Sequence, residues 1–200
     1  MGSLLVALGL FDQGGVPAGL YYLVPSTLIG AALFLLADLL ARHRGRVADR
    51  LVAAPALPQA ALFAGLFFAA AVAMAGMPPL SGVLGKLLIL DASRASPAGA
   101  WIWAVVIGTS LVVILGFARA GSTLFWKTPP DSGGAAPGGR QARALPVGVC
   151  TSLVAATALL AAFAGPITNE LSATARQVLE PQTYGRAVLP TAARVAAFGR

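Results

Sequence analysis

Long apolar stretches separated by short basic clusters constrain this chain more than any single motif. Four of them cover residues 16–41, 58–91, 99–126 and 145–165, and a shorter one covers residues 3–11. A helix needs about 20 apolar residues to cross a bilayer, so the four long stretches suffice. Inside hydrocarbon, every backbone group must be bonded within the helix or the bundle. The sequence predicts an all-α, polytopic membrane helix bundle of about four spans, one of them a broken helix.

The composition excludes the main soluble alternatives. Hydrophobic residues make up 58% of the chain and charged residues only 10%, and the mean hydropathy is +0.81, whereas a soluble domain carries about 25% charged residues. The net charge of +7 does not indicate nucleic-acid binding, because the arginines form short clusters between apolar stretches rather than a basic face. We expect a lipid bilayer, not nucleic acid, as the surrounding partner.

The basic clusters predict the topology. The first loop contains Arg42, Arg44, Arg46 and Arg50, and the third contains Lys127, Arg140 and Arg143, whereas the loop of residues 92–98 has only Arg94. Because cytoplasmic loops are enriched in Lys and Arg, both basic loops are expected on the cytoplasmic side. Three tryptophans at the ends of one stretch fit membrane interfaces: Trp101, Trp103 and Trp126.

The sequence also predicts how the chain is divided. We expect a transmembrane bundle over residues 1–165, in which the Gly/Pro-rich residues 127–144 form a flexible loop. Residues 1–11 lack the basic start of a signal peptide and resemble the tail of a longer helix. Residues 166–200 are expected to form an amphipathic tail on the membrane surface or a partner, because of the apolar spacing of Leu171, Ala175, Val178 and Leu179.

A helix break divides residues 58–91, which are too long for one straight span. It consists of Gly76, Met77, Pro78 and Pro79. Interrupted helices free backbone carbonyls at membrane depth, where they are tolerated only if protein or water covers them. Such breaks therefore indicate ion sites. Another proline, Pro25, lies inside the first long stretch and is expected to kink that helix.

Lys86 follows the break by seven residues and lies in an apolar segment. An intramembrane cation is costly and therefore marks a candidate site. One interpretation is that its long side chain snorkels toward the outer interface, where Asp91 and Arg94 follow. The other is that desolvation destabilises the ammonium form, so that the lysine exchanges protons with a file of water.

Other polar residues in the apolar stretches have simpler interpretations. Asp38 is expected to pair with Arg42 at the end of its helix, and Arg119 either snorkels toward Trp126 or lines a polar route. His43 is expected to be a solvated loop residue among arginines. For four hydroxyl residues a packing role is expected rather than conduction: Ser26, Thr27, Thr109 and Ser110.

The sequence contains no constellation for a cofactor or for covalent catalysis. With one cysteine, Cys150, and one histidine, it cannot form an internal disulfide or a His/Cys metal site. No nucleophile elbow, phosphate-binding loop or dinucleotide fingerprint appears. We therefore expect a chain that is not an enzyme and that binds neither a metal nor a cofactor.

The segment GMPPLSGVLGKLLIL resembles the broken helix of the antiporter-like membrane subunits shared by respiratory complex I and the Mrp (Pha, Mnh) cation/proton antiporters. Three further segments follow the C-terminal order of the D-subunit family of Mrp complexes: LYYLVPSTLIGAALFLLADLLARHRG, GFARAGSTLFWK and LEPQTYGRAVL. Members of this family have about fourteen spans, so the resemblance concerns their last third. It covers nearly all 200 residues.

The resemblance implies a role for individual residues. The lysine at the position of Lys86 is the family's proposed proton-relay group in the C-terminal half-channel. The glutamate and lysine of the N-terminal half-channel have no counterpart here, and Pro25 stands where the family has a histidine. The resemblance thus implies one half-channel, with Ser81, Gly82, Arg119 and Asp38 near Lys86 in the bundle.

These observations lead to one main hypothesis and two alternatives. The main hypothesis is a membrane subunit of a multisubunit monovalent cation/proton antiporter, which moves protons and Na⁺ together with other subunits in the bacterial inner membrane. The first alternative is a proton-pumping subunit of complex I or of a membrane-bound hydrogenase. The second is a truncated remnant, a fragment that packs against partners without conducting.

Overall fold

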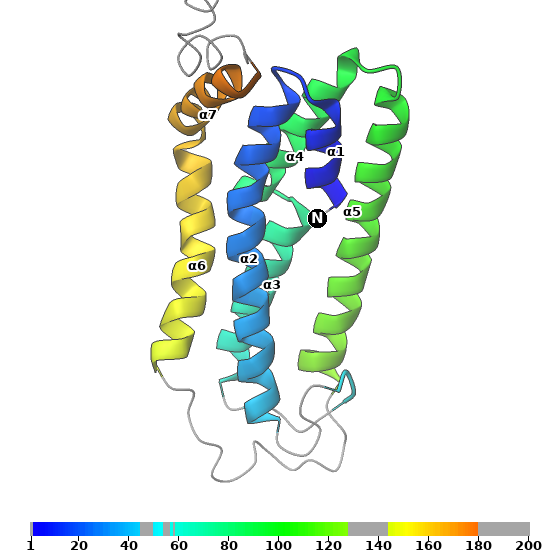
Figure 1. Cartoon of the computed structure of the whole chain (residues 1–200). Coiled ribbons are helices and arrows are strands. Elements are labelled where there is room, and N and C mark those ends of the chain that lie inside the picture. The colour runs from blue at the N-terminus through cyan, green and yellow to red at the C-terminus, as the bar shows by residue number, and fades with distance from the viewer. Residues whose placement is uncertain (1, 45–49, 54–56, 58, 128–143, 180–200) are drawn as a thin grey trace, which may run out of the picture.

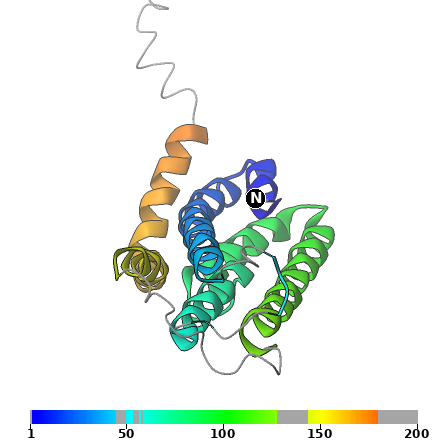
Figure 2. The same cartoon turned by 90° about the horizontal axis from the view of Figure 1, so that it is seen from below.

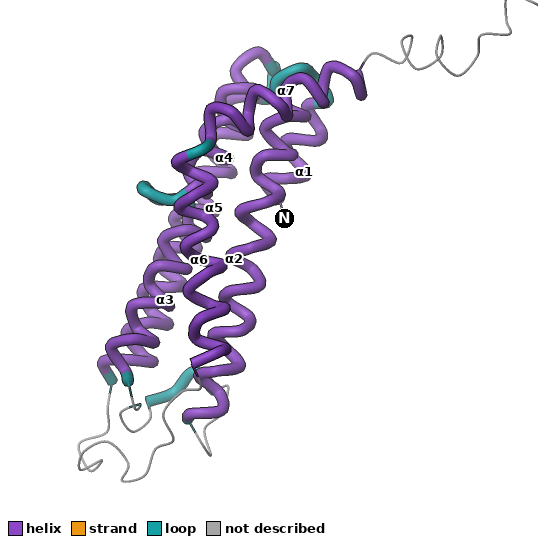
Figure 3. Tube along the Cα trace, turned by 90° about the vertical axis from the view of Figure 1, so that its left-hand side faces the viewer, coloured by secondary structure: helices purple, strands orange, loops and turns teal. Residues whose placement is uncertain are grey.

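The computed structural model describes residues 2–44, 50–53, 57, 59–127 and 144–179, and these residues form helices joined by short turns. Figure 3 shows helices and loops but no strands in this part of the chain. The predicted all-α membrane bundle is thereby confirmed. Most of the loop predicted over residues 127–144, and the tail beyond residue 179, lie outside the described residues.

The helices follow the predicted apolar stretches closely. A short helix, α1 (Gly2–Leu10), precedes the 29-residue α2 (Gly15–His43). After the first basic loop come α3 (Ala60–Ala75) and α4 (Ser81–Ala92), which share one predicted stretch, and a 3₁₀ turn at Ser93–Ala95. The rest are α5 (Gly99–Gly121), extended by a π-helical turn at Ser122–Trp126, then α6 (Ala144–Ala162) and α7 (Ala164–Leu179).

Three of these helices are long and apolar enough to cross a membrane: α2, α5 with its π-helical extension, and α6. The pair α3 and α4 covers the remaining long stretch, residues 58–91, as the predicted broken helix. The long α2 passes through Pro25 without ending, although proline donates no backbone hydrogen bond. The prediction of about four spans, one of them broken, therefore describes the bundle.

Helix α2 holds the bundle together. Five other helices contact it, namely α1, α3, α4, α6 and α7, and Figures 1 and 2 show it between α6 and the pair α3 and α4. The phenol of Tyr21, almost fully buried, donates to the carbonyl of Leu160 on α6 at 3.1 Å. In contrast, α5 contacts fewer helices and keeps large apolar side chains exposed along its length, as expected for a face toward lipid or a partner.

The described part of the predicted tail is α7, which bends away from α6 and lies beside α2 at one end of the bundle (Figures 1 and 2). Ala175 is buried and Leu171 and Leu179 are partly covered, on a helix that contacts α2. Val178 remains 59% exposed. Helix α7 therefore packs on the chain's own bundle, through its contact with α2.

Small residues let α4 approach α2 closely. A Cβ atom built on Gly85 would lie 2.9 Å from Cδ2 and 3.2 Å from Cα of Tyr22. Close helix contacts of this kind are typical of membrane bundles, where small residues let backbones meet. The contact also fixes the position of α4 along the axis of α2, since Gly85 lies opposite Tyr22.

We predict that Gly85→Val destabilises the bundle, because the new side chain overlaps the backbone of Tyr22 and overpacking costs about 1–3 kcal/mol. The midpoint of thermal unfolding in detergent should fall. The matched control is Gly108→Val on α5, where a Cβ meets nothing within 4 Å. If both variants unfold at the same temperature, the result would contradict the close contact between α4 and α2.

Candidate functional site

The broken helix forms the centre of the candidate site. Helix α3 ends at Ala75, and Gly76 follows with a φ of 75°, a left-handed conformation that suits glycine. The amide of Gly76 donates to the carbonyl of Ala73 at 3.2 Å, and the amide of Met77 donates to that of Val72 at 3.0 Å. This pair of bonds is a Schellman motif. It satisfies two of the carbonyls that the end of α3 leaves open.

The chain then restarts as α4 after two prolines that have no backbone N–H to satisfy. Leu80 is extended and its carbonyl accepts the first bond of α4, from Val83 at 3.3 Å. A Cβ atom on Gly82 would lie only 2.2 Å from the carbonyl oxygen of Ala73. The first turn of α4 therefore rests directly against the last turn of α3, and only glycine fits there.

Lys86 turns back toward this break. Its Nζ donates to the carbonyl of Ala75 at 2.7 Å and to Oγ of Ser110 on α5 at 2.8 Å. Its stem lies against Gly76, where an added Cβ would be 2.7 Å from Cδ of Lys86. The snorkelling interpretation is therefore wrong, because the ammonium group bonds inside the bundle rather than reaching toward Asp91 and Arg94.

The partners of Lys86 are all electrically neutral. Lys86 forms no ion pair in the part of the chain that the structure describes, where Asp91 pairs instead with Arg94 at 3.5 Å. The carbonyl end of α3 supplies partial negative charge, since a helix carries about half an elementary charge at its C-terminus. The site therefore accommodates a cation without a carboxylate that would hold it permanently charged.

Ser110 is the residue that sequence reasoning missed. The sequence predicts a packing role for it, yet its hydroxyl accepts from Lys86 and donates to the carbonyl of Val106 at 2.7 Å. The hydroxyls of Ser26, Thr27 and Thr109 donate to carbonyls of their own helices, and their packing role stays a prediction. The signal for Ser110 in the sequence is a hydroxyl inside a long apolar stretch, and Ser26, Thr27 and Thr109 carry the same signal.

The structure brings Ser81 and Gly82 to the break but places Asp38 and Arg119 elsewhere. Ser81 is fully buried, and its Oγ has no hydrogen-bond partner among the described residues. Asp38 pairs with Arg42 at 2.8 Å, as predicted, and both side chains are exposed. It lies sixteen residues beyond Tyr22, or about 24 Å along α2. Arg119 is exposed nine residues beyond Ser110, so neither residue lines the lysine site.

His43 also departs from expectation. It belongs to the last turn of α2 rather than to a solvated loop, and its ring lies 5.3 Å from that of Phe63 on α3. Its Nδ1 is 2.7 Å from the carbonyl of Leu39. A helix longer than the apolar stretch explains the difference, because α2 continues two residues beyond it.

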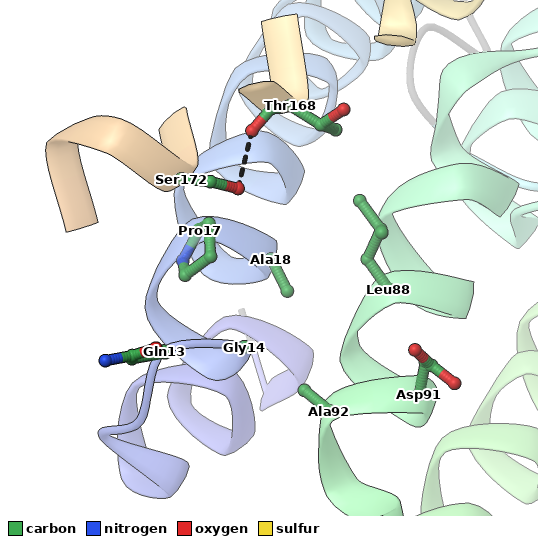
Figure 4. A pocket seen from close by; sticks show the side chains of 9 residues that line it. All are labelled: Gln13, Gly14, Pro17, Ala18, Leu88, Asp91, Ala92, Thr168 and Ser172. Carbon is green, nitrogen blue, oxygen red and sulfur yellow. Dashed lines mark hydrogen bonds between the residues drawn. The ribbon is translucent and has the colours of Figure 1, made fainter. Parts of the chain in front are cut away.

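A separate pocket of about 170 Å³ opens at the far end of α4, between the start of α2 and α7 (Figure 4). Asp91 and Gln13 line it, together with Thr168 and Ser172, whose hydroxyl donates to the carbonyl of Thr168. Lys86 is not among the lining residues. Its amine points the other way along α4, so the pocket and the lysine site are distinct.

The fold and the site define a class: a membrane helix bundle in which the amine of a lysine is held at the break of a discontinuous helix. Residues 1–114 match the family described as NADH:quinone oxidoreductase/Mrp antiporter, transmembrane. The chain belongs to this family. The resemblance inferred from the broken helix is thereby confirmed.

Individual relatives extend the match. The probable K⁺/H⁺ antiporter D subunit of Rhizobium meliloti is 31% identical over 94% of this chain and 39% of its own length. The Na⁺/H⁺ antiporter D subunit of Alkalihalophilus pseudofirmus is 28% identical over 94% of this chain and 37% of its length. The NADH-quinone oxidoreductase N subunit of Desulforudis audaxviator is 30% identical over 74% of this chain and 28% of its length. The chain thus spans less than two fifths of the length of these relatives.

We predict that Gly76→Ala destabilises the protein, because a non-glycine residue in this conformation costs about 1–3 kcal/mol and the new methyl group would overlap Lys86. Thermal unfolding in detergent should show a lower midpoint. The control, Gly65→Ala in the middle of α3, meets nothing within 4 Å and should unfold at or above the wild-type temperature, since alanine favours helices. A Gly76→Ala variant as stable as this control would contradict the geometry of the break.

Proposed function

We propose that this chain serves as a membrane subunit of a multisubunit monovalent cation/proton antiporter, in which Lys86 carries the proton through one half-channel. The observation that carries the proposal is the position of the Lys86 amine, held between the broken end of α3 and Ser110 of α5. The names of the antiporter relatives support this function.

A proton carrier must exist in two charge states during transport. A carboxylate at hydrogen-bond distance would stabilise the ammonium form strongly, whereas neutral carbonyl and hydroxyl groups stabilise it less. Lysine also changes its charge more readily than arginine when it is desolvated. The neutral partners of Lys86 therefore suit a group that gains and loses its proton.

The proposal includes partners and a location. Other subunits of the antiporter complex would complete the route, since the relatives are named as subunits and are much longer than this chain. The relatives' names include both Na⁺ and K⁺, and we propose Na⁺ as the cation, with K⁺ as the other to be tested. We place the chain in the inner membrane of a bacterial cell as a multi-pass protein.

A second candidate is a proton-pumping subunit of a complex I-type enzyme, supported by the relatives named as N subunits of NADH-quinone oxidoreductase. The two candidates differ in their driving force. Membrane vesicles energised by a pH gradient would exchange protons for Na⁺ or K⁺ under the first. Under the second, proton movement would require NADH oxidation and no monovalent cation.

We predict that Lys86→Ala in the assembled complex lowers cation-dependent proton exchange at least about tenfold, because loss of a proton-transfer group commonly costs a factor of 10² or more. Dequenching of a pH-sensitive dye in everted membrane vesicles measures the rate after addition of Na⁺ or K⁺. Lys127→Ala, at the exposed end of the π-helical turn, is the matched control and should transport as the wild type does. Full transport by Lys86→Ala would support the non-conducting alternative instead.

Asp38→Asn should leave exchange within about twofold of the wild type, because an exposed ion pair contributes only about 0–1 kcal/mol and this one lies far from Lys86. The same vesicle assay measures it. A strong loss in Asp38→Asn, with normal amounts of complex in the membrane, would show that the proton route runs along α2 rather than past the helix break.

A further inference from the structure

Ser110 holds Lys86 from a helix that otherwise contributes little to the core. Among the residues of α5, Gly99, Val106 and Gly121 are buried, and Val106 lies one turn before Ser110. The hydroxyl of Ser110 stands 2.8 Å from Nζ of Lys86 and 2.7 Å from the carbonyl of Val106. We propose that Ser110 is a positioning residue of the proton route that holds Lys86 in both of its charge states, an inference that rests on the proposed function.

The two partners of the lysine differ in what they can do. In the charged state, the ammonium donates to the carbonyl of Ala75 and to Oγ of Ser110, whose own hydrogen goes to Val106. After Lys86 releases a proton to water, its nitrogen has a lone pair that needs a donor. A carbonyl has no hydrogen to donate, but a hydroxyl both donates and accepts.

The switch requires only a rotation of one hydroxyl hydrogen. It turns from the carbonyl of Val106 to Nζ of Lys86 when the lysine becomes neutral, and it turns back when a proton returns. Ser110 itself neither gains nor loses a proton in this cycle. The carbonyl of Val106 keeps the backbone bond from the amide of residue 110 in the regular helix, so the rotation does not leave this carbonyl without a donor.

Among the described residues, the hydroxyl that bonds Nζ of Lys86 is that of Ser110 on α5. On α2, the hydroxyls of Ser26 and Thr27 donate to carbonyls of their own helix, and Pro25 has no polar side chain. Helices α1 and α3 carry no titratable side chain, and α6 carries only Cys150, which is directed at the carbonyl of Ala32. The other titratable or charged groups on the described elements packed against α4 are Tyr21, Tyr22, Asp38, Arg42, His43, Asp91, Arg94 and Arg119.

The test measures the rate of proton exchange against pH in vesicles that contain the whole complex, normalised to the amount of assembled complex. Ser110→Ala should lower the rate about tenfold and shift the pH profile about one unit toward acid, because a hydrogen bond to a charged group is roughly twice as strong as one between neutral groups. Ser110→Thr should restore both values toward the wild type, because it keeps the hydroxyl on the same helix face.

Thr109→Ala is the matched control, since the hydroxyl of Thr109 donates only to carbonyls of its own helix, and it should behave as the wild type does. If Ser110→Ala does not assemble, Ser110→Cys keeps a similar volume but offers the ammonium a weaker acceptor, and it should shift the pH profile in the same acid direction. An unchanged pH profile in a variant that assembles would overturn the inference, whatever its rate. Normal transport by Lys86→Ala would overturn the proposed function instead, which separates the two failures.

Discussion

The hydrogen bond from Lys86 to the carbonyl of Ala75 is the contact on which the broken helix depends. A helix that ends at membrane depth leaves carbonyls without donors, and each unsatisfied group there costs several kcal/mol. The amides of Gly76 and Met77 satisfy two carbonyls, and the two prolines that follow bring no further donors that need a partner. The lysine thus compensates the break while the break supplies partial negative charge to the lysine.

This mutual compensation explains the small residues around the site. Gly76 must be left-handed and must leave room for the lysine stem, while Gly82 must allow the first turn of α4 to touch the last turn of α3. Gly85 brings the same helix against Tyr22 of α2. Because the three contacts fix α4 in height and direction, they also fix where a long side chain at position 86 can reach.

Helix α5 completes the site from the outside of the bundle. Its attachment to α4 uses polar bonds, one from Lys86 to Ser110 and one from the indole of Trp103 to the carbonyl of Leu90 at 3.1 Å. In hydrocarbon, apolar contacts alone give little preference between helix and lipid, so interhelical hydrogen bonds help to specify the neighbour. The same bond that orients the lysine therefore also fastens a largely exposed helix.

The sequence alone determined the helices, the position of the break and the presence of a lysine after it, because these follow from apolar length and from the local chemistry of glycine and proline. It also paired Asp38 with Arg42, four residues apart on one helix face. The tertiary structure alone decided that Lys86 turns toward the break, that Ser110 receives it, that His43 packs on Phe63, and that Asp38 and Arg119 lie apart from the site. The physical reason is that a long side chain bonds to whichever groups helix packing brings near it. The local sequence pattern does not show which helix faces meet.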